Sequence, residues 1–148
     1  MTDWKLVILE SPYAGEIEAN VEYARAAVRD CVLRGESPNV SHLLFTQLGI
    51  LRDEVPEERA LGIAAGLAWK RVADYSVFYT DRGWSRGMLN ALDKIIDECR
   101  NQVLSVVLFD LLLRAKVSIR SLEDTPLLPT VCHVAVADAL VKCLSGAR

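Results

Sequence analysis

The chain has 148 residues, of which 51% are hydrophobic and 25% are charged, a composition typical of one globular domain with a substantial core. The formal net charge of -3 and the pI near 5.4 argue against binding to a nucleic acid polymer, because such binding needs a dense basic face. No apolar run reaches the roughly 20 residues of a membrane span, so no membrane partner is expected.

Cysteine usage and the first residues bear on the cellular compartment. The chain has 4 cysteines, which are widely separated and show no spacing of the zinc or thioredoxin type. We therefore expect reduced thiols and no metal site. The first residues do not pair a basic segment with an apolar one, so we expect no signal peptide and a cytoplasmic location.

The first half of the chain predicts a strand–helix unit followed by a less regular segment. Residues 4–9 form an apolar run typical of a strand inside a parallel sheet, and residues 16–34 have the apolar periodicity of a helix. Residues 36–39 predict a loop, and residues 43–45 predict a second short strand.

A second helix is predicted over residues 56–72, because Pro56 and the acids after it suit the first turn of a helix. Gly62, Gly66 and Trp69 fall on one face of this helix. This smooth strip predicts either close packing on the sheet or contact with a ligand, and packing on the sheet is the more common explanation.

The second half predicts a strand over 75–80, a long helix over about 86–115, an edge strand over 116–122 and a last helix over about 130–144. Strands that alternate with helices predict an α/β fold, a three-layer sandwich with a mostly parallel, Rossmann-like sheet of four to five strands. The pattern fits a single domain over residues 1–148. Residues 103–113 are apolar nearly all round, so this helix is either buried on two sides or in contact with another subunit, and we expect a homo-oligomer, at least a dimer.

The segment from Asp81 to Met88 predicts a turn that leads from a strand into a helix. Ser85 is a natural N-cap, and the free backbone N–H groups behind it favour an anion. Arg82 or Arg86 could add a charge-assisted contact to a phosphate or carboxylate. Glycines at 83 and 87 would let the backbone turn sharply or approach a ligand.

Two loops, Glu10-Ser-Pro-Tyr and Asp81-Arg-Gly-Trp-Ser-Arg-Gly-Met, thus stand at the ends of two strands of one sheet. In this arrangement, and in the helix sequence of residues 56–69, the chain resembles the nucleoside 2-deoxyribosyltransferase-like superfamily, most closely an uncharacterised branch common in phages and bacteria. The resemblance implies a small-molecule nucleotide or nucleoside as partner, no cofactor, and cleavage or transfer of an N-glycosidic bond.

The catalytic carboxylate of that superfamily has no obvious counterpart in this chain. Many relatives carry a nucleophilic glutamate where this sequence has Ala91, and Asp93 is expected to point away from the site on a helix. Glu10 could supply the carboxylate from the end of the first strand, or it could cap nearby backbone. Glu57 and Glu58 are further candidates, although compensation of the helix dipole explains both more simply.

The resemblance also predicts which residues would bind a nucleotide. Tyr13 would stack on a base or contact the sugar, or else cover the end of the sheet. Asp81 would hold a ribose hydroxyl, or else fix the turn. His42 has no partner visible in the sequence and is expected to be structural. The full predicted nucleotide-binding set is Ser11, Pro12, Tyr13, Asp81, Gly83, Trp84, Ser85, Arg86, Gly87 and Met88.

Three hypotheses for function follow in this order. The first is an enzyme that cleaves or transfers the N-glycosidic bond of a nucleotide, with Glu10 or Glu57 as the catalytic residue. The second is a catalytically silent protein that senses or sequesters a nucleotide signal, which Ala91 favours. The third is a scaffold whose apolar segment assembles subunits.

Overall fold

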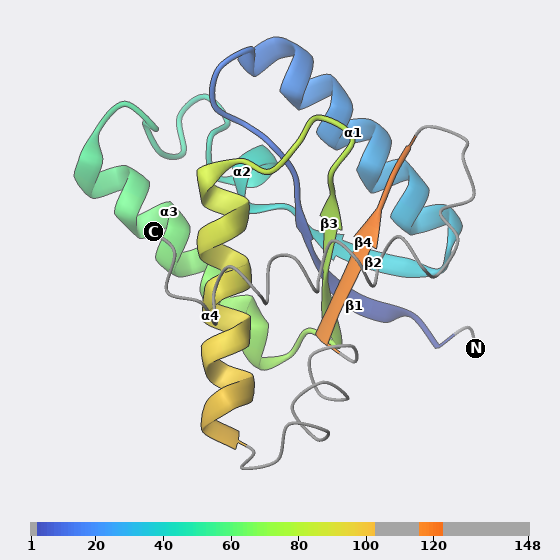
Figure 1. The fold of residues 1–148 in the computed structure, drawn as a ribbon. Coiled ribbons are helices and arrows are strands. Elements are labelled where there is room, and N and C mark those ends of the chain that lie inside the picture. Colours follow the sequence, from blue (N-terminus) through green and yellow to red (C-terminus); the bar gives the residue numbers. More distant parts are fainter. Residues whose placement is uncertain (1–2, 103–115, 123–148) are drawn as a thin grey trace.

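The computed structural model describes residues 3–102 and 116–122, and these form a mixed α/β fold around a parallel sheet (Figure 1). Four strands of the described chain pair in the order β2-β1-β3-β4. All three pairings are parallel, as the alternation of strands and helices predicts. The strands are β1 (Lys5–Glu10), β2 (Glu36–Asn39), β3 (Tyr75–Tyr79) and β4 (Val117–Arg120).

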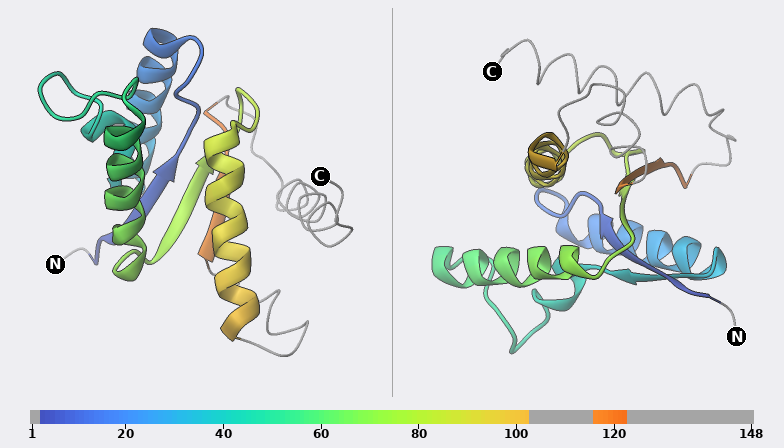
Figure 2. Two further views of the ribbon diagram at one scale, coloured as in Figure 1. Left: turned by 90° about the vertical axis from the view of Figure 1, so that its left-hand side faces the viewer. Right: turned by 90° about the horizontal axis from the view of Figure 1, so that it is seen from below.

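Helices cover both faces of this sheet and make the expected three layers (Figure 2). Helix α1 (Ile17–Leu33) lies on one face, while α3 (Pro56–Ala68) and α4 (Arg86–Gln102) lie on the other. A single helical turn, α2 (Ser41–Leu44), precedes α3, and the 3-10 turn η1 (Trp69–Arg71) continues it. The α/β sandwich predicted from the sequence is therefore confirmed.

The alternation of side chains along the strands divides the core into two parts. Val7 and Leu9 of β1 face α1, where they pack with Tyr23, Ala27 and Cys31. On the other face, Phe78 and Ile119 pack against the buried side of α4: Met88, Ala91, Leu92, Ile95, Ile96 and Cys99. Each fully buried large apolar side chain contributes about 1.5–3 kcal/mol to folding. Ile8 and Glu10 point to the α3–α4 face.

The prediction of a strand at 43–45 is wrong. Residues Ser41–Leu44 form α2, and the second strand is β2, in the segment predicted to be a loop. Among the described strands β2 pairs only with β1, which makes it an edge strand of this sheet, where the missing N–H of Pro38 costs no ladder hydrogen bond. Its extended conformation comes from pairing with β1, and a sequence pattern of four mostly polar residues does not reveal such pairing.

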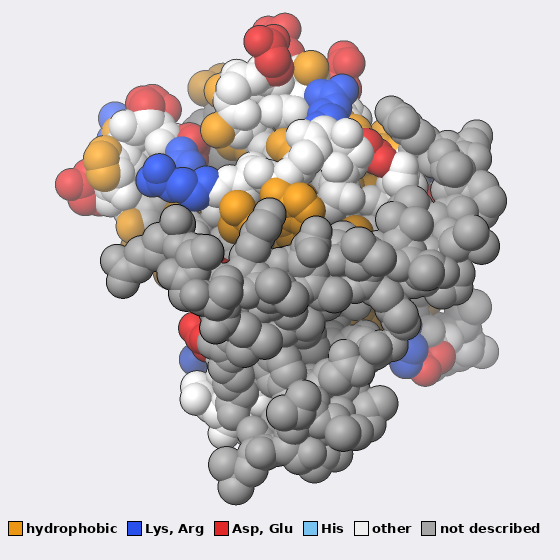
Figure 3. Space-filling model, viewed as in Figure 1, with side chains coloured by type: hydrophobic (Ala, Val, Ile, Leu, Met, Phe, Trp, Pro, Cys, Tyr) orange, Lys and Arg blue, Asp and Glu red, His pale blue; other side chains and the backbone are white. Residues whose placement is uncertain are grey.

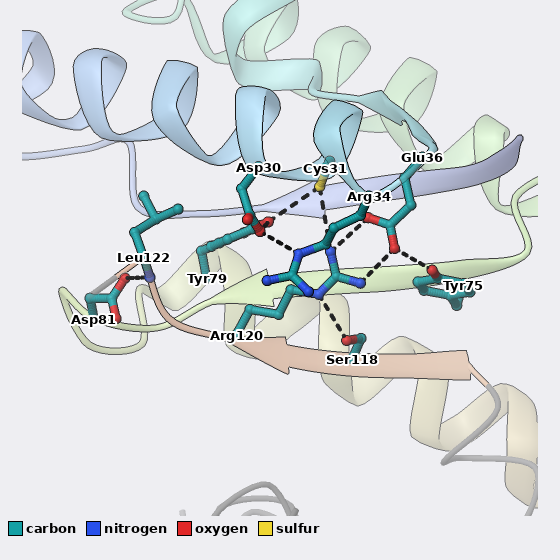
Figure 4. Close-up of polar contacts among 10 residues, drawn as sticks. All are labelled: Asp30, Cys31, Arg34, Glu36, Tyr75, Tyr79, Asp81, Ser118, Arg120 and Leu122. Carbon is teal, nitrogen blue, oxygen red and sulfur yellow. Dashed lines mark hydrogen bonds and ion pairs between the residues drawn. The ribbon is translucent and has the colours of Figure 1, made fainter. Parts of the chain in front are cut away.

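A buried polar network joins the two edges of the sheet on the α1 face (Figure 4). Arg120 of β4 donates two hydrogen bonds of 2.6 Å to the two carboxylate oxygens of Glu36 in β2. The hydroxyl of Tyr75 donates to the same carboxylate. Burial disfavours the charge on Glu36, but these hydrogen bonds together keep its pKa below the usual value. The network therefore holds β2 and β4 in register across β1 and β3.

Two predicted elements lie wholly or partly outside the described residues. The long helix predicted over 86–115 is described as far as Gln102, and its remainder, including the apolar segment 103–113, falls outside. The helix predicted over 130–144 lies outside as well. Within the described part of the chain, no helix has the length and apolar character needed to cross a membrane.

Candidate functional site

A cavity of about 520 Å³ opens at the carboxyl ends of the strands, on the face that α3 and α4 cover. Ligands of parallel α/β sheets usually bind at this edge, because loops and helix N-termini gather there. The cavity is lined by Glu10 and Tyr13 after β1, by His42 of α2, and by Ser85 and Arg86 at the start of α4. The two loops singled out in the sequence thus contribute to one cavity.

Glu10 is the carboxylate that β1 contributes to the wall of this cavity. It ends β1 and accepts no hydrogen bond from the described residues, although the cavity beside it is open. Burial raises its pKa from 4.5 to about 7, and the nearby ammonium of Lys70 limits the rise. A carboxyl group with a pKa near neutral pH can give up a proton or take one there, which suits a general acid or base.

Lys70 is a cation in the cavity wall that the sequence did not suggest. It lies in η1, where its Nζ is buried, has no hydrogen-bond partner in the described chain and lies 3.9 Å from Oε1 of Glu98. Burial lowers the pKa of Lys70. In the sequence, Lys70 stands out only as a lysine that follows the apolar helix α3. The packing of η1 is what brings it near Glu10.

Ser11 and His42 form a hydrogen-bonded pair in the wall of the cavity. Oγ of Ser11 lies 2.9 Å from Nε2 of His42, and the ring of Tyr13 lies 5.9 Å from the imidazole, centroid to centroid. Burial lowers the pKa of His42 to about 4, so the imidazole is neutral at physiological pH. His42 therefore has a partner after all, and the pair anchors the loop that carries Tyr13 onto α2.

The N-terminus of α4 faces the same cavity. Oγ of Ser85 accepts a hydrogen bond of 3.3 Å from the backbone N–H of Met88, so the N-cap predicted at Ser85 is confirmed. Gly83 in the preceding turn has a φ of 80°, which favours glycine. Arg86 and Gly87 line the cavity, so a cation and free N–H groups stand at its mouth.

Comparison with known proteins assigns the chain to a family. The family model described as Domain of unknown function (DUF7768) matches residues 5–104, a range that includes every described element from β1 to α4. The chain belongs to the DUF7768 family. No curated protein and no solved structure matches it. The family's description names no activity, so the resemblance to the deoxyribosyltransferase-like superfamily stays a prediction.

In this DUF7768 domain, the first part of the Asp81–Met88 loop faces α1 rather than the cavity. The carboxylate of Asp81 accepts hydrogen bonds from the Tyr23 hydroxyl at 2.6 Å and from the backbone N–H of Leu122 at 2.8 Å. This geometry matches the alternative in which Asp81 fixes the turn. The Arg82 guanidinium lies over the ring of Tyr23, and Trp84 packs on Phe78.

Some of the other predicted site residues line the cavity, and others lie outside it. Glu57 is exposed on the first turn of α3 and does not line the cavity. Glu58 lines it but is engaged in an ion pair with Arg52. Pro12 is buried outside the cavity, whereas Met88, 1% exposed, forms part of its floor.

Ala91 and Asp93 both line the cavity from α4. Ala91 is 7% exposed and forms part of the cavity wall, at the position where the resemblance to the deoxyribosyltransferase-like superfamily predicts a nucleophilic glutamate. The expectation that Asp93 points away from the site is wrong, because the cavity is wide enough to reach the flank of α4 as well as its inner side.

The glycine strip of α3 packs against α2 rather than against the sheet. A Cβ added to Gly66 would lie 2.8 Å from Cβ of Ser41, closer than side chains allow. A Cβ added to Gly62 would lie 3.3 Å from Cδ1 of Leu51 in the loop after α2, a tight contact, while Trp69 is 45% exposed. The prediction of close packing is thus correct, but its partner is wrong, because α3 leans away from the strands and leaves the cavity between them.

Proposed function

We propose that the cavity binds a nucleotide or nucleoside and that Glu10 catalyses cleavage of its N-glycosidic bond. The observation that carries the proposal is a carboxyl group with a pKa of about 7 that faces an open cavity of about 520 Å³. A group of that pKa can donate a proton and take one back at neutral pH. The size of the cavity suits a ligand of nucleotide size.

Two features support the orientation of the ligand. The N-terminus of α4, with Ser85 and Arg86, would hold a phosphate through backbone N–H groups and a charge-assisted hydrogen bond. Tyr13 has its ring on the cavity wall, where it would stack on the base or contact the sugar. The sugar would then lie between the two, near Glu10.

In the proposed reaction, the bond between the anomeric carbon and the base nitrogen breaks, and its electron pair leaves with the base. The protonated Glu10 gives its proton to that base. Water then adds to the anomeric carbon and gives a proton to the Glu10 carboxylate, which restores the starting state. The chain thus needs no covalent intermediate, which agrees with Ala91 at the position of the superfamily nucleophile.

Ala91 also favours hydrolysis over transfer to a second base. Transfer is most efficient when a covalent sugar–enzyme intermediate protects the anomeric carbon from water, and an alanine methyl group cannot form one. We therefore expect water to be the acceptor.

The test is release of free base from a panel of deoxynucleosides and deoxynucleoside monophosphates, followed by chromatography. Wild-type protein should release base from at least one of them, and Glu10→Gln should lose this activity while it still binds the ligand. Glu22→Gln, an exposed change in the middle of α1, is the matched control. Base release that Glu10→Gln leaves unchanged would remove Glu10 from the mechanism.

Ala91 also motivates a second candidate, a nucleotide-binding protein without chemistry. In that case a nucleotide should raise the melting temperature and be recovered intact from the complex. If no nucleotide or nucleoside in the panel raises the melting temperature, both candidates are wrong.

A further inference from the structure

Helix α3 is apolar around most of its circumference, yet little of it is buried. From Ala60 to Ala68 its sequence has no charged or polar side chain, and Gly66 is the one fully buried residue of the helix. Leu61 is 62% exposed on the side away from the cavity, whereas Ile63, 51% exposed, lines the cavity. Helices of this composition are normally covered on more than one side, because exposed apolar surface is unfavourable in water.

The exposed surface of α3 has a smooth centre and an acidic and a basic end. Ala60, Ala64 and Ala68 are all exposed and recur every four residues, so they form a stripe along the helix. Glu57 extends this stripe at the N-terminal end and Arg71 extends it through η1 at the other end. In Figure 3, apolar side chains lie among charged ones at the left of the molecule, where Figure 1 places α3.

We propose that this surface is the contact between two copies of the chain, packed through antiparallel α3 helices. A two-fold axis beside Ala64 would set Ala60 of one copy opposite Ala68 of the other. The same axis would set Glu57 of each copy opposite Arg71 of the other copy, which gives two ion pairs across the contact. Both charged residues are exposed, and neither forms an ion pair with another described residue.

This arrangement satisfies the physical requirements of helix packing. Alanine at the centre lets the two helix axes approach to about 8 Å, the lower end of the usual range. Leu61 flanks the stripe and would be covered by the partner. The opposite side of α3, with Gly62 and Gly66, lines the cavity, so a dimer would leave the cavity open and stiffen one of its walls.

Sedimentation velocity or light scattering on the full chain tests the proposal. The wild type should have twice the 16.4 kDa mass of one chain at micromolar concentration. Ala64→Arg brings two large like charges together at the axis and should make the protein monomeric. Leu33→Glu, on an exposed residue of α1, should leave the dimer intact.

A charge exchange distinguishes this contact from any other. Glu57→Arg alone, or Arg71→Glu alone, places like charges opposite each other and should weaken the dimer about threefold to tenfold. The double variant restores opposite charges and should recover most of the affinity. A monomeric wild type, or a dimer that Ala64→Arg does not affect, would overturn the proposal; the second result would assign the interface to another segment. Circular dichroism of each variant checks that it folds.

Discussion

The substitution Glu10→Gln should stabilise the protein at alkaline pH and leave its stability almost unchanged at acid pH. Glutamine keeps the shape of the side chain but has no charge. In the wild type, burial raises the pKa of Glu10 from 4.5 to about 7. Between pH 4.5 and about pH 7, Glu10 is mostly protonated in the folded protein and mostly ionised in the unfolded chain.

The sign and size of the effect follow from this difference. Below about pH 4.5 Glu10 is protonated in both states, so its carboxyl group causes no penalty. As the pH rises above 4.5, Glu10 ionises in the unfolded chain but stays protonated in the folded protein, and this favours unfolding. The loss of folding free energy reaches its full size above about pH 7, where Glu10 is ionised in both states. At about 1.4 kcal/mol per pKa unit, the penalty at about pH 8 is on the order of 3 kcal/mol.

Urea unfolding of wild type and Glu10→Gln at about pH 4 and about pH 8 measures the effect. The variant should exceed the wild type by about 2–3 kcal/mol at the higher pH and by less than about 0.5 kcal/mol at the lower. Glu22→Gln is again the control. Lys70→Met should remove the cation that favours the Glu10 carboxylate and so raise its pKa further, which carbon NMR of the labelled side chain can follow. Equal stabilities of Glu10→Gln and wild type at both pH values would refute the account of Glu10 as a carboxyl that burial keeps protonated.

Two further substitutions test the packing around the site. Arg120→Met should destabilise the fold by about 3–5 kcal/mol in urea unfolding, because Glu36 would be left buried without its cation. The double variant Arg120→Met with Glu36→Met should recover much of that loss. If it recovers none, the unpaired charge of Glu36 is not the cause of the destabilisation. Gly66→Ala should cost about 1–3 kcal/mol, because the new methyl group would overlap Cβ of Ser41. Adding Ser41→Gly should relieve it, and a Gly66→Ala variant as stable as the wild type would show that α2 can shift.

Local patterns in the sequence predicted most of the elements correctly. Apolar runs marked β1 and β3, and the helical periodicity marked α1, α3 and α4. β2 was missed because Glu36–Asn39 has no apolar alternation of its own, and its conformation depends on the ladder with β1. The same applies to α2, whose single turn is too short for a periodic signal.

The candidate site was predictable where it depends on the ends of strands. The residues after β1 and those that begin α4 meet in one cavity because parallel strands present their carboxyl ends at one edge. Asp81 and Glu57 are carboxylates like Glu10, and the sequence predicted both as site residues. Hydrogen bonds hold Asp81 in the turn, and Glu57 is exposed on α3. Residue type and spacing do not distinguish a carboxylate that faces a cavity from one that faces solvent.

The α/β class, the helix start at Ser85 and the two loops at the edge of the sheet were predictable from the amino-acid sequence, because each depends on residues close together in the chain. The tertiary structure alone decided that Glu10 is a buried carboxyl with a pKa of about 7 and that His42 pairs with Ser11. The same packing brings Lys70 near Glu10 and leaves an apolar face of α3 exposed within one copy of the chain. Burial and electrostatic contact depend on which distant segments pack together, and no local pattern encodes that.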